Sequence, residues 1–215
     1  MIIGAVRFET ETSRNTLDEQ VRGSIGSCSE RTAPLSRTDS ITTERLLLRR
    51  WCEDDREPFA EMMADVEFNR YMPGPFDRSE SDAMIEHFQD NFETEGFGMW
   101  ALELPGKTPF IGCVGLTVPR TALPFCPCVE IGWRIAPRLW NHGYATEGAL
   151  AALRFGFEQA ELDEIVSFTV PDNLASCRVM EKIGMRHDPD GDFEHPGLVE
   201  GHPLRAHILY RIKRS

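Results

Sequence analysis

An apolar stretch, a turn that contains glycine and the start of a long amphipathic helix follow one another without interruption between Trp133 and Glu147, in the segment WRIAPRLWNHGYATE. The first N–H groups of a helix have no partner inside the helix, and the helix start carries about half a positive charge. Gly143 lets the chain bring these groups close to a ligand. We therefore predict a strand, a tight turn and a helix, with the backbone N–H groups of residues 141–146 forming a seat for an anion such as a pyrophosphate.

A second motif begins at Asn173 and reads NLASCRVMEKIG, after an apolar stretch at residues 165–170 that we expect to be a strand. The two segments together resemble the GNAT superfamily of acyl-CoA-dependent N-acyltransferases. In detail they are similar to its RimJ/RimL-like branch, in which Trp-x-x-Gly-Tyr-Ala-Thr-Glu precedes Asn-x-x-Ser-x-x-x-x-x-Lys-x-Gly. Trp140 stands where many other branches have Gln or Arg, which narrows the assignment to this branch. The resemblance covers roughly residues 43–213.

Length and composition favour a single catalytic domain. The chain has 215 residues, of which 41% are hydrophobic, enough for one sizeable core but hardly for two full domains. The resemblance implies an α/β fold of the mixed α+β kind over residues 41–215, with a mixed, mostly antiparallel, splayed central β-sheet and helices on both faces. Residues 1–40 show no sustained period of 2 or 3.6, so we expect a disordered or irregular extension. Alternatively, the sequence as given starts upstream of the protein's true first residue, or residues 2–8 add a strand to a partner.

Composition also disfavours several classes of function. No apolar run approaches the roughly 20 residues that a membrane-spanning helix needs, and the first residues do not form a signal peptide. The formal net charge of −12, without a cluster of Lys and Arg, argues against binding to duplex nucleic acid. Six scattered cysteines indicate core or surface thiols and not a disulfide framework, which favours a reducing compartment. We expect a cytoplasmic protein whose acidic surface attracts cationic amines.

The N-terminal half of the predicted domain shows two amphipathic helices. Four apolar residues at i, i+3, i+4 and i+7 form the stripe of the first helix: Phe59, Met62, Met63 and Val66. Asp77 with Glu80 three residues later predicts a capping box at the start of the second. The buried face of the second helix is predicted to contain Met84, Ile85, Phe88 and Phe92.

Two further patterns concern the sheet and the helix after the turn. A hairpin is predicted at residues 99–103 and 110–118, and Gly112 and Gly115 in its second strand indicate a bulge or a close backbone approach. The helix from Gly143 to Gln159 has small residues that allow it to lie close to a sheet. Larger core residues beside them are predicted to be Leu150, Leu153 and Phe157.

The resemblance implies an acyl-CoA site in which pantetheine lies in the opening between residues 129–135 and 165–170. Asn173 is expected to cap the following helix and to bond the pantetheine arm, although capping alone would explain its type. Arg138, and also Arg134, could reach a CoA phosphate, but a solvated arginine explains them at least as well. The predicted cofactor-binding residues are Trp133, Ile135, Arg138, Asn141, His142, Gly143, Tyr144, Ala145, Thr146, Asn173 and Ser176.

The implied reaction is attack of an amine on a thioester, which needs a neutral amine, a stabilised oxyanion and a departing thiolate. Glu130 lies on the strand expected to border the acetyl group and is the candidate general base, acting directly or through water. The alternative is a surface or strand-pairing glutamate. Ser176 matches the family serine proposed to protonate or hydrogen-bond the departing sulfur. Oxyanion stabilisation is expected from a backbone N–H group near Ile135, so the predicted catalytic side chains are those of Glu130 and Ser176.

The ionisation of amines favours an α-amine as acceptor. An α-amino group of pKa about 7.8 is about 10% neutral at pH 7, against about 0.04% for a lysine of pKa about 10.4. The resemblance implies an N-acetyltransferase that uses acetyl-CoA as co-substrate, and a protein N-terminus is the acceptor that the branch resemblance favours. The alternatives are transfer to a small amine, such as a polyamine or an aminoglycoside, and a non-catalytic acyl-CoA-binding module.

Expectations about metals and partners follow from residue spacing and charge. No metal is expected, because the histidines and cysteines lack the paired spacing of structural zinc sites. The loop at residues 188–203 is expected near the acceptor pocket, where His195 or His202 would touch the substrate. The expected partners are a small-molecule acyl donor and an amine acceptor, with no nucleic acid and no membrane. The protein is expected to be a monomer or a homodimer.

Overall fold

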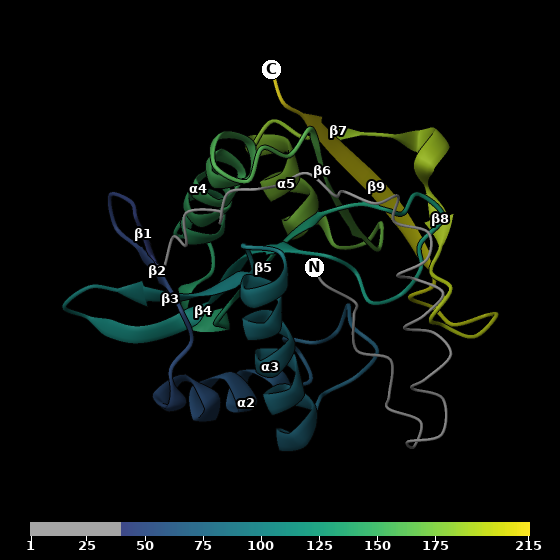
Figure 1. The fold of residues 1–215 in the computed structure, drawn as a ribbon. Coiled ribbons are helices and arrows are strands. Elements are labelled where there is room, and N and C mark those ends of the chain that lie inside the picture. The colour runs from purple at the N-terminus through teal and green to yellow at the C-terminus, as the bar shows by residue number, and fades with distance from the viewer. Residues whose placement is uncertain (1–39) are drawn as a thin grey trace.

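The computed structural model describes residues 40–215, which form an open β-sheet with helices on both faces (Figure 1). Except for Ser40, the predicted N-terminal extension lies outside the described residues. The helices are α2 (Arg56–Ala64), α3 (Arg78–Thr94), α4 (Tyr144–Glu158) and α5 (Leu174–Lys182), with 3₁₀ turns η1 (Glu53–Asp55), η2 (Pro137–Leu139) and η3 (Pro189–Gly191). The strands are β1 (Ser40–Thr42), β2 (Leu47–Arg49), β3 (Met99–Leu104), β4 (Thr108–Thr117), β5 (Glu130–Ile135), β6 (Glu164–Thr169), β7 (Arg186–His187), β8 (Phe193–Glu194) and β9 (Ala206–Lys213).

The sheet runs in the order β1-β2-β3-β4-β5-β6-β9-β7, and β8 also pairs with β9. Neighbouring strands are antiparallel except for β5 and β6, which are parallel. Whereas β4 and β5 pair along the whole of β5, the described strands β5 and β6 pair at one position, Glu130 with Val166. The N–H group of Val166 donates to the carbonyl of Val129 at 2.9 Å beside this position. The two strands are thus joined at one end and diverge beyond it, which confirms the predicted splay.

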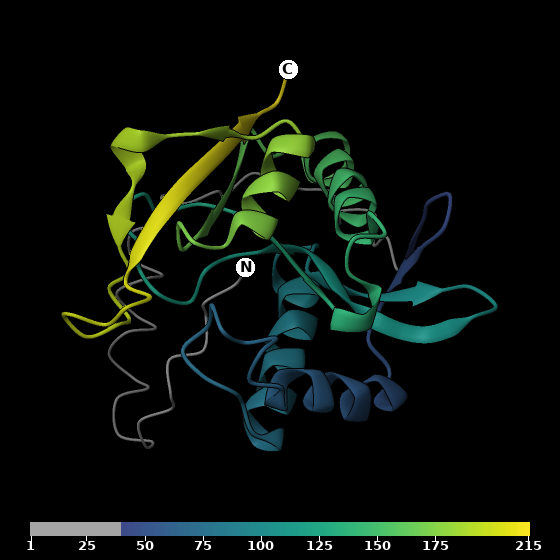
Figure 2. The same ribbon diagram turned by 180° about the vertical axis from the view of Figure 1, so that it is seen from behind.

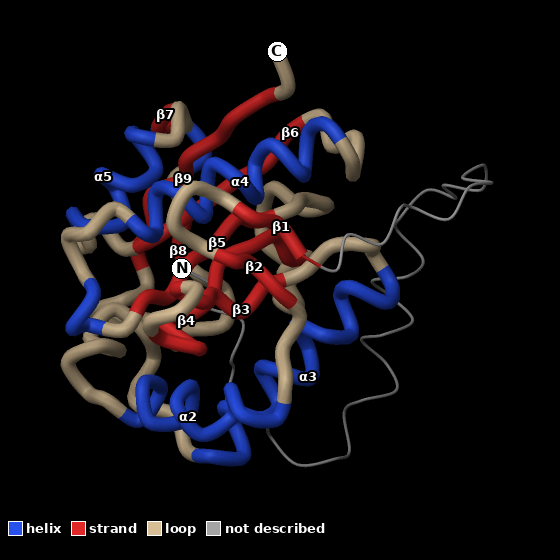
Figure 3. Tube along the Cα trace, turned by 90° about the vertical axis from the view of Figure 1, so that its left-hand side faces the viewer, coloured by secondary structure: helices blue, strands red, loops and turns tan. Residues whose placement is uncertain are grey.

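Alternate residues of the strands supply two cores on opposite faces of the sheet. On β3, Trp100 and Leu102 join the cluster that contains residues of α4 and α5, whereas Met99 and Ala101 join the cluster under α2 and α3. Trp100 is fully buried and meets Phe155 of α4 edge to face at 5.1 Å. Figures 2 and 3 show the strands as a layer between the two pairs of helices. This arrangement confirms the predicted mixed fold with helices on both faces.

The start of α3 confirms the predicted capping box. The side chain of Asp77 accepts from the N–H group of Glu80 at 2.9 Å, and the N–H group of Asp77 donates to the side chain of Glu80 at 2.8 Å. The predicted apolar face of this helix is buried, at Met84, Ile85, Phe88 and Phe92. No helix in the described part of the chain is long and apolar enough to cross a bilayer.

Two predicted core residues prove to be exposed. Val66 is 70% exposed because α2 ends at Ala64, where the side-chain amide of Asn69 donates to the carbonyls of Met63 (2.8 Å) and Asp65 (2.7 Å) and stops the helix. Leu150 of α4 is 43% exposed. Leu150 points away from the side of α4 that touches the sheet. That side is centred on four small residues: Gly148, Ala149, Ala152 and Gly156.

The close backbone approach predicted for β4 is confirmed. A Cβ atom on Gly115 would lie 2.1 Å from the carbonyl oxygen of Gly98. Gly112 has a φ of +136°, and a Cβ atom there would lie 2.0 Å from the carbonyl oxygen of Arg134 on β5. Glycine at both positions therefore lets β4 lie against its neighbours on either side.

Candidate active site

The turn before α4 presents a run of unpaired backbone N–H groups. Asn141 and Gly143 have φ values of 64° and 82°, and Gly143 is the N-cap of the helix. In the described chain, the N–H groups of residues 141–146 donate to no backbone carbonyl, whereas those of Leu139 and Trp140 on one side and Glu147 on the other do. The fifteen residues of α4 add their dipole at this end. The turn therefore has the geometry and the polarity that an anion seat needs, and the binding of an anion there stays a prediction.

A cluster of residues from the start of the domain holds this turn in place. Arg45 donates to the carbonyl of His142 at 2.9 Å and to the carboxylate of Glu147 at 2.7 Å, and its guanidinium lies 4.8 Å from the centroid of the Tyr144 ring. Thr43 donates to the same carboxylate at 2.6 Å. Partial burial alone would raise the pKa of Glu147, but the bonds from Thr43 and Arg45 and the charge of Arg45 outweigh it and lower that pKa. Sequence reasoning missed Arg45, because nothing in its neighbourhood indicates a contact about a hundred residues away.

The second motif places a hydroxyl at the end of β6. Asn173 caps α5, as predicted, through its side-chain oxygen, which accepts from the N–H group of Ser176 at 3.3 Å. The amide nitrogen of Asn173 donates to Thr169 and to Ser176, both at 3.0 Å. The hydroxyl oxygen of Ser176, which is nearly buried, accepts the bond from Asn173. The hydroxyl hydrogen of Ser176 can therefore still be donated to another group. The predicted contact of Asn173 with pantetheine stays a prediction.

Glu130 begins β5 beside the junction with β6 and is 1% exposed. Burial raises the pKa of its carboxyl to about 7, although the positive charge of Arg134 acts in the opposite direction. Ile131, Trp133 and Ile135 pack in the core of α4, so the alternation of β5 turns Glu130 to the face of α2 and α3. A buried carboxyl that is half ionised near neutral pH is suited to accept and release a proton.

Arg134 does not take the position suggested for a phosphate ligand. It is 4% exposed, and its guanidinium contacts the sulfurs of Met63 at 3.3 Å and Met72 at 3.1 Å on the face of α2 and α3. Burial lowers the pKa of Arg134, and the nearby groups of Cys113 and Glu130 oppose this effect. The buried guanidinium of Arg134 is therefore not available to the turn before α4. Arg134 instead shares the inner face of β5 with Glu130.

The remaining predicted cofactor residues fall into two groups. Trp133 and Ile135 are buried in the core of α4, so their side chains are committed to packing. The carbonyl of Ile135 also accepts from the indole N–H group of Trp140 at 2.6 Å, which ties the turn to the end of β5. Arg138 is exposed on η2. For all three predicted residues, contact with a cofactor stays a prediction.

Two buried histidines lie side by side in the C-terminal part of the chain. His195 is 1% exposed and lies 5.2 Å from buried His207 between ring centroids, next to Phe168 and Phe193. Burial lowers the pKa of His207, whose Nδ1 lies 3.0 Å from the carbonyl of Arg205 and must donate to it. The predicted contact of His195 or His202 with an acceptor stays a prediction. Within residues 40–215, no three potential metal ligands come together.

Comparisons with known proteins agree with this geometry. The family model of the acetyltransferase (GNAT) domain matches residues 45–186. The FsC-acetyl coenzyme A-N(2)-transacetylase of Aspergillus fumigatus is 34% identical over 171 residues, which are 75% of this chain and 67% of that protein. The crystal structure of an acetyltransferase from Agrobacterium tumefaciens is similar, with a TM-score of 0.67 and 27% identity over 81% of this chain and 94% of that chain. The fold is also shared with Mycobacterium smegmatis RimJ in complex with CoA-disulfide, with a TM-score of 0.61 and 20% identity over 78% of this chain and 81% of that chain.

Proposed function

The chain belongs to the GNAT acetyltransferase family, and from this membership we propose that it transfers an acetyl group from acetyl-CoA to an α-amino group. The observation that carries the proposal is Glu130, a buried carboxyl with a pKa near 7 at the point where β5 and β6 diverge. Acetyl-CoA fits the residues that surround this opening. The amides of residues 141–146 suit its pyrophosphate, and the gap between β5 and β6 suits its pantetheine arm.

The pKa of Glu130 supports an α-amine over a lysine or a polyamine. An α-ammonium group of pKa about 7.8 lies within about one unit of the Glu130 carboxyl, so proton transfer between them is nearly balanced. A lysine or alkylamine of pKa about 10.4 lies more than about three units above it, which makes the same transfer over a hundredfold less favourable. Glu130 would take the proton, directly or through water, and Ser176 would donate a hydrogen bond to the departing sulfur.

Two kinds of α-amine are candidate acceptors. A protein N-terminus is the acceptor that the branch resemblance favours. A small molecule with an α-amine is the second candidate, because the relative from Aspergillus fumigatus is named as a transacetylase for an N(2) position. A non-catalytic acyl-CoA-binding module would keep the anion seat and have no use for a buried carboxyl with a raised pKa.

Thiol release from acetyl-CoA tests the proposal. The purified protein would be titrated with acetyl-CoA by calorimetry and then assayed with short peptides, polyamines and aminoglycosides. We expect saturable binding, and thiol release that depends on acceptors with an α-amine. Release that depends only on polyamines or aminoglycosides would contradict the choice of an α-amine. Binding without release from any amine would favour the non-catalytic module.

Replacing Ser176 by Ala is expected to lower kcat by about tenfold, because one hydrogen bond to the departing sulfur contributes about 1.4 kcal/mol. The affinity for acetyl-CoA should change little, because the turn before α4 supplies most of the predicted contacts. Stopped-flow or steady-state thiol release would give kcat, and calorimetry would give the affinity. The matched control is Ser81→Ala, which removes another buried hydroxyl, from α3, and should leave kcat unchanged. An unchanged kcat in Ser176→Ala would remove Ser176 from the mechanism.

Replacing Arg45 by Ala is expected to weaken acetyl-CoA binding by about tenfold, which corresponds to about 1.4 kcal/mol. The change frees the carbonyl of His142 and removes the positive charge that faces the carboxylate of Glu147, beside the proposed position of the phosphates. Calorimetry measures the effect, and kcat at saturating acetyl-CoA should stay close to the wild-type value. In Arg45→Ala/Glu147→Gln, affinity should recover in part. Arg78→Ala removes the same charge from an exposed position on α3 and serves as the control, and equal affinities of the two arginine variants would contradict this role.

A further inference from the structure

Two thiols lie side by side in the loop that joins β4 to β5. The sulfur atoms of Cys126 and Cys128 are 3.6 Å apart. Cys126 is exposed and Cys128 is half-buried, so a small oxidant in solvent can reach the pair. The proposed acetyl transfer uses neither thiol.

The neighbours of the two cysteines fix this pair. The Cys126 sulfur accepts from the N–H group of Leu123 at 3.4 Å, and Cys128 packs against the cluster that contains Phe168. Phe125, which directly precedes Cys126, packs edge to face against the ring of Phe193, with 5.0 Å between the ring centroids.

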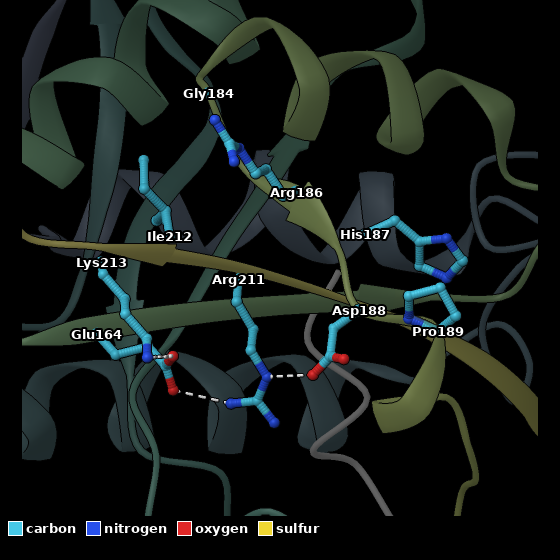
Figure 4. Close-up of a pocket in the computed structure, with 9 residues that line it drawn as sticks. All are labelled: Glu164, Gly184, Arg186, His187, Asp188, Pro189, Arg211, Ile212 and Lys213. Atoms are coloured by element: carbon cyan, nitrogen blue, oxygen red, sulfur yellow. Dashed lines mark hydrogen bonds and ion pairs between the residues drawn. The ribbon is translucent and has the colours of Figure 1, made fainter.

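Arg211 covers the same loop from β9. Its guanidinium lies 5.5 Å from the centroid of the Phe125 ring. Figure 4 shows Arg211 held between Glu164 at 2.8 Å and Asp188 at 2.6 Å, at the edge of a pocket formed by β6, β7 and β9. The loop is thus anchored on both sides of the thiols, which keeps them close to each other.

The thiols lie next to the junction on which the proposed mechanism depends. Cys128 is followed by Val129, whose carbonyl accepts from Val166 of β6, and then by Glu130. Disulfide formation brings two sulfurs to about 2.05 Å, so the sulfurs of this pair must approach by about 1.5 Å. Because the N–H group of Leu123 holds the Cys126 sulfur, the approach also moves Cys128, which leads directly into β5, and this movement is transmitted to Glu130.

We propose that Cys126 and Cys128 form a redox modification site, which hydroperoxides oxidise to an intramolecular disulfide that slows acetyl transfer by displacing Glu130. The effect on transfer rests on the proposed function. The Cys126 thiolate attacks one oxygen of hydrogen peroxide, which forms a sulfenic acid and, after protonation, one water. The Cys128 sulfur then attacks the Cys126 sulfur and displaces the hydroxyl group, which leaves as a second water with the Cys128 proton. Two thiols are oxidised by two electrons, and one peroxide is reduced to two waters.

The order of these steps follows from exposure. Burial, with the neighbouring Cys126, raises the pKa of the Cys128 thiol and keeps it protonated. Cys126 is the more exposed sulfur, so it is the one that peroxide reaches first. Cys128 then serves as the resolving thiol.

Mass spectrometry of the full chain after peroxide treatment tests the modification without any assay of activity. Trypsin is expected to cut after Arg120 and Arg134, so a peptide of residues 121–134 contains both cysteines and no others. In the wild type, this peptide should lose the mass of two hydrogen atoms, resist alkylation and recover both properties after treatment with dithiothreitol. Cys126→Ser should show no such loss. Absence of the linked peptide in folded wild-type protein would overturn the proposal.

Thiol-independent detection of the acetylated acceptor tests the effect on transfer. Oxidised wild type should show a kcat about tenfold lower than the reduced protein, since a displaced general base loses part of a contribution of about a hundredfold or more. Reduction should restore kcat, and Cys126→Ser should have wild-type kcat with and without peroxide. Cys52→Ser, which removes another exposed thiol, should stay as sensitive as the wild type. A linked peptide with unchanged kcat, or a Cys126→Ser variant that peroxide still inhibits, would overturn the proposed effect. If the reduced protein transfers no acetyl group, the proposed function fails while the mass measurement still decides the disulfide.

Discussion

Glu130→Gln is expected to lower kcat by a factor of about a hundred to ten thousand, the usual contribution of a positioned general base. The amide keeps the shape of the carboxyl but cannot accept the proton of the ammonium group. Because Glu130 is buried beside the β5–β6 junction and the proposed anion seat is the turn before α4, acetyl-CoA affinity should stay near the wild-type value. Rapid-quench or steady-state kinetics with an α-amine acceptor measure the effect. Glu158→Gln, at an exposed position on α4, is the matched control and should keep full activity.

The pH profile of the same pair of proteins identifies the group. At saturating acetyl-CoA and acceptor, kcat of the wild type should rise with pH through an apparent pKa near 7, because Glu130 must lose its proton to act as a base. This limb should be missing from the residual activity of Glu130→Gln. If kcat of Glu130→Gln still rises with pH as in the wild type, the titration belongs to another group. Equal kcat values of the two proteins would exclude Glu130 as the base.

Glu130→Gln is also expected to stabilise the protein at alkaline pH by about 3 kcal/mol, from a pKa that rises from 4.5 to about 7 at about 1.36 kcal/mol per unit. The folded protein binds the Glu130 proton more tightly than the unfolded chain. This group therefore favours the folded state most below pH 4.5, and its contribution is lost as the pH rises to about 7. Gln removes this dependence, since it carries no charge at any pH.

Urea denaturation of both proteins at pH 5 and pH 8 measures this difference. The free energies of unfolding should differ by less than about 1 kcal/mol at pH 5, and the variant should be the more stable by about 3 kcal/mol at pH 8. Glu158→Gln again provides the control, because an exposed carboxyl should give the same small difference at both pH values. A variant that is less stable than the wild type at pH 8 would mean that the ionised carboxylate is well compensated in the folded protein. The buried carboxyl is thus expected to reduce stability while it increases activity.

Features with a local cause could be predicted from the sequence. The capping box at Asp77, the cap at Asn173 and the tight turn at Gly143 each depend on residues within one turn of the chain, so the residue types indicate the geometry. The order of strand, turn and helix around Gly143 could likewise be predicted, whereas its role as an anion seat stays a prediction. The motifs also placed Glu130 on a strand and Ser176 in the first turn of a helix, as the structure has them in β5 and α5. The catalytic roles of these two residues stay predictions.

Features that depend on distant contacts could not be predicted. Arg45 meets Glu147 across about a hundred residues, and a charged residue in the turn between β1 and β2 gives no sign of such a partner. Arg134 lies on the face of β5 toward α2 and α3, and the choice of face depends on the register of the whole sheet. Val66 continues the helical period of α2, yet the side chain of Asn69 ends the helix before it. In each case, tertiary packing overrides a pattern that is correct only locally.

A single peptide with both a free α-amino group and a lysine tests the central claim most directly. The peptide would be incubated at pH 7 with acetyl-CoA and the protein, and tandem mass spectrometry would locate the acetyl group. We expect acetylation of the α-amino group at a rate that Glu130→Gln lowers by at least about a hundredfold. Acetylation of the lysine alone, or α-acetylation at the same rate in both proteins, would contradict the account.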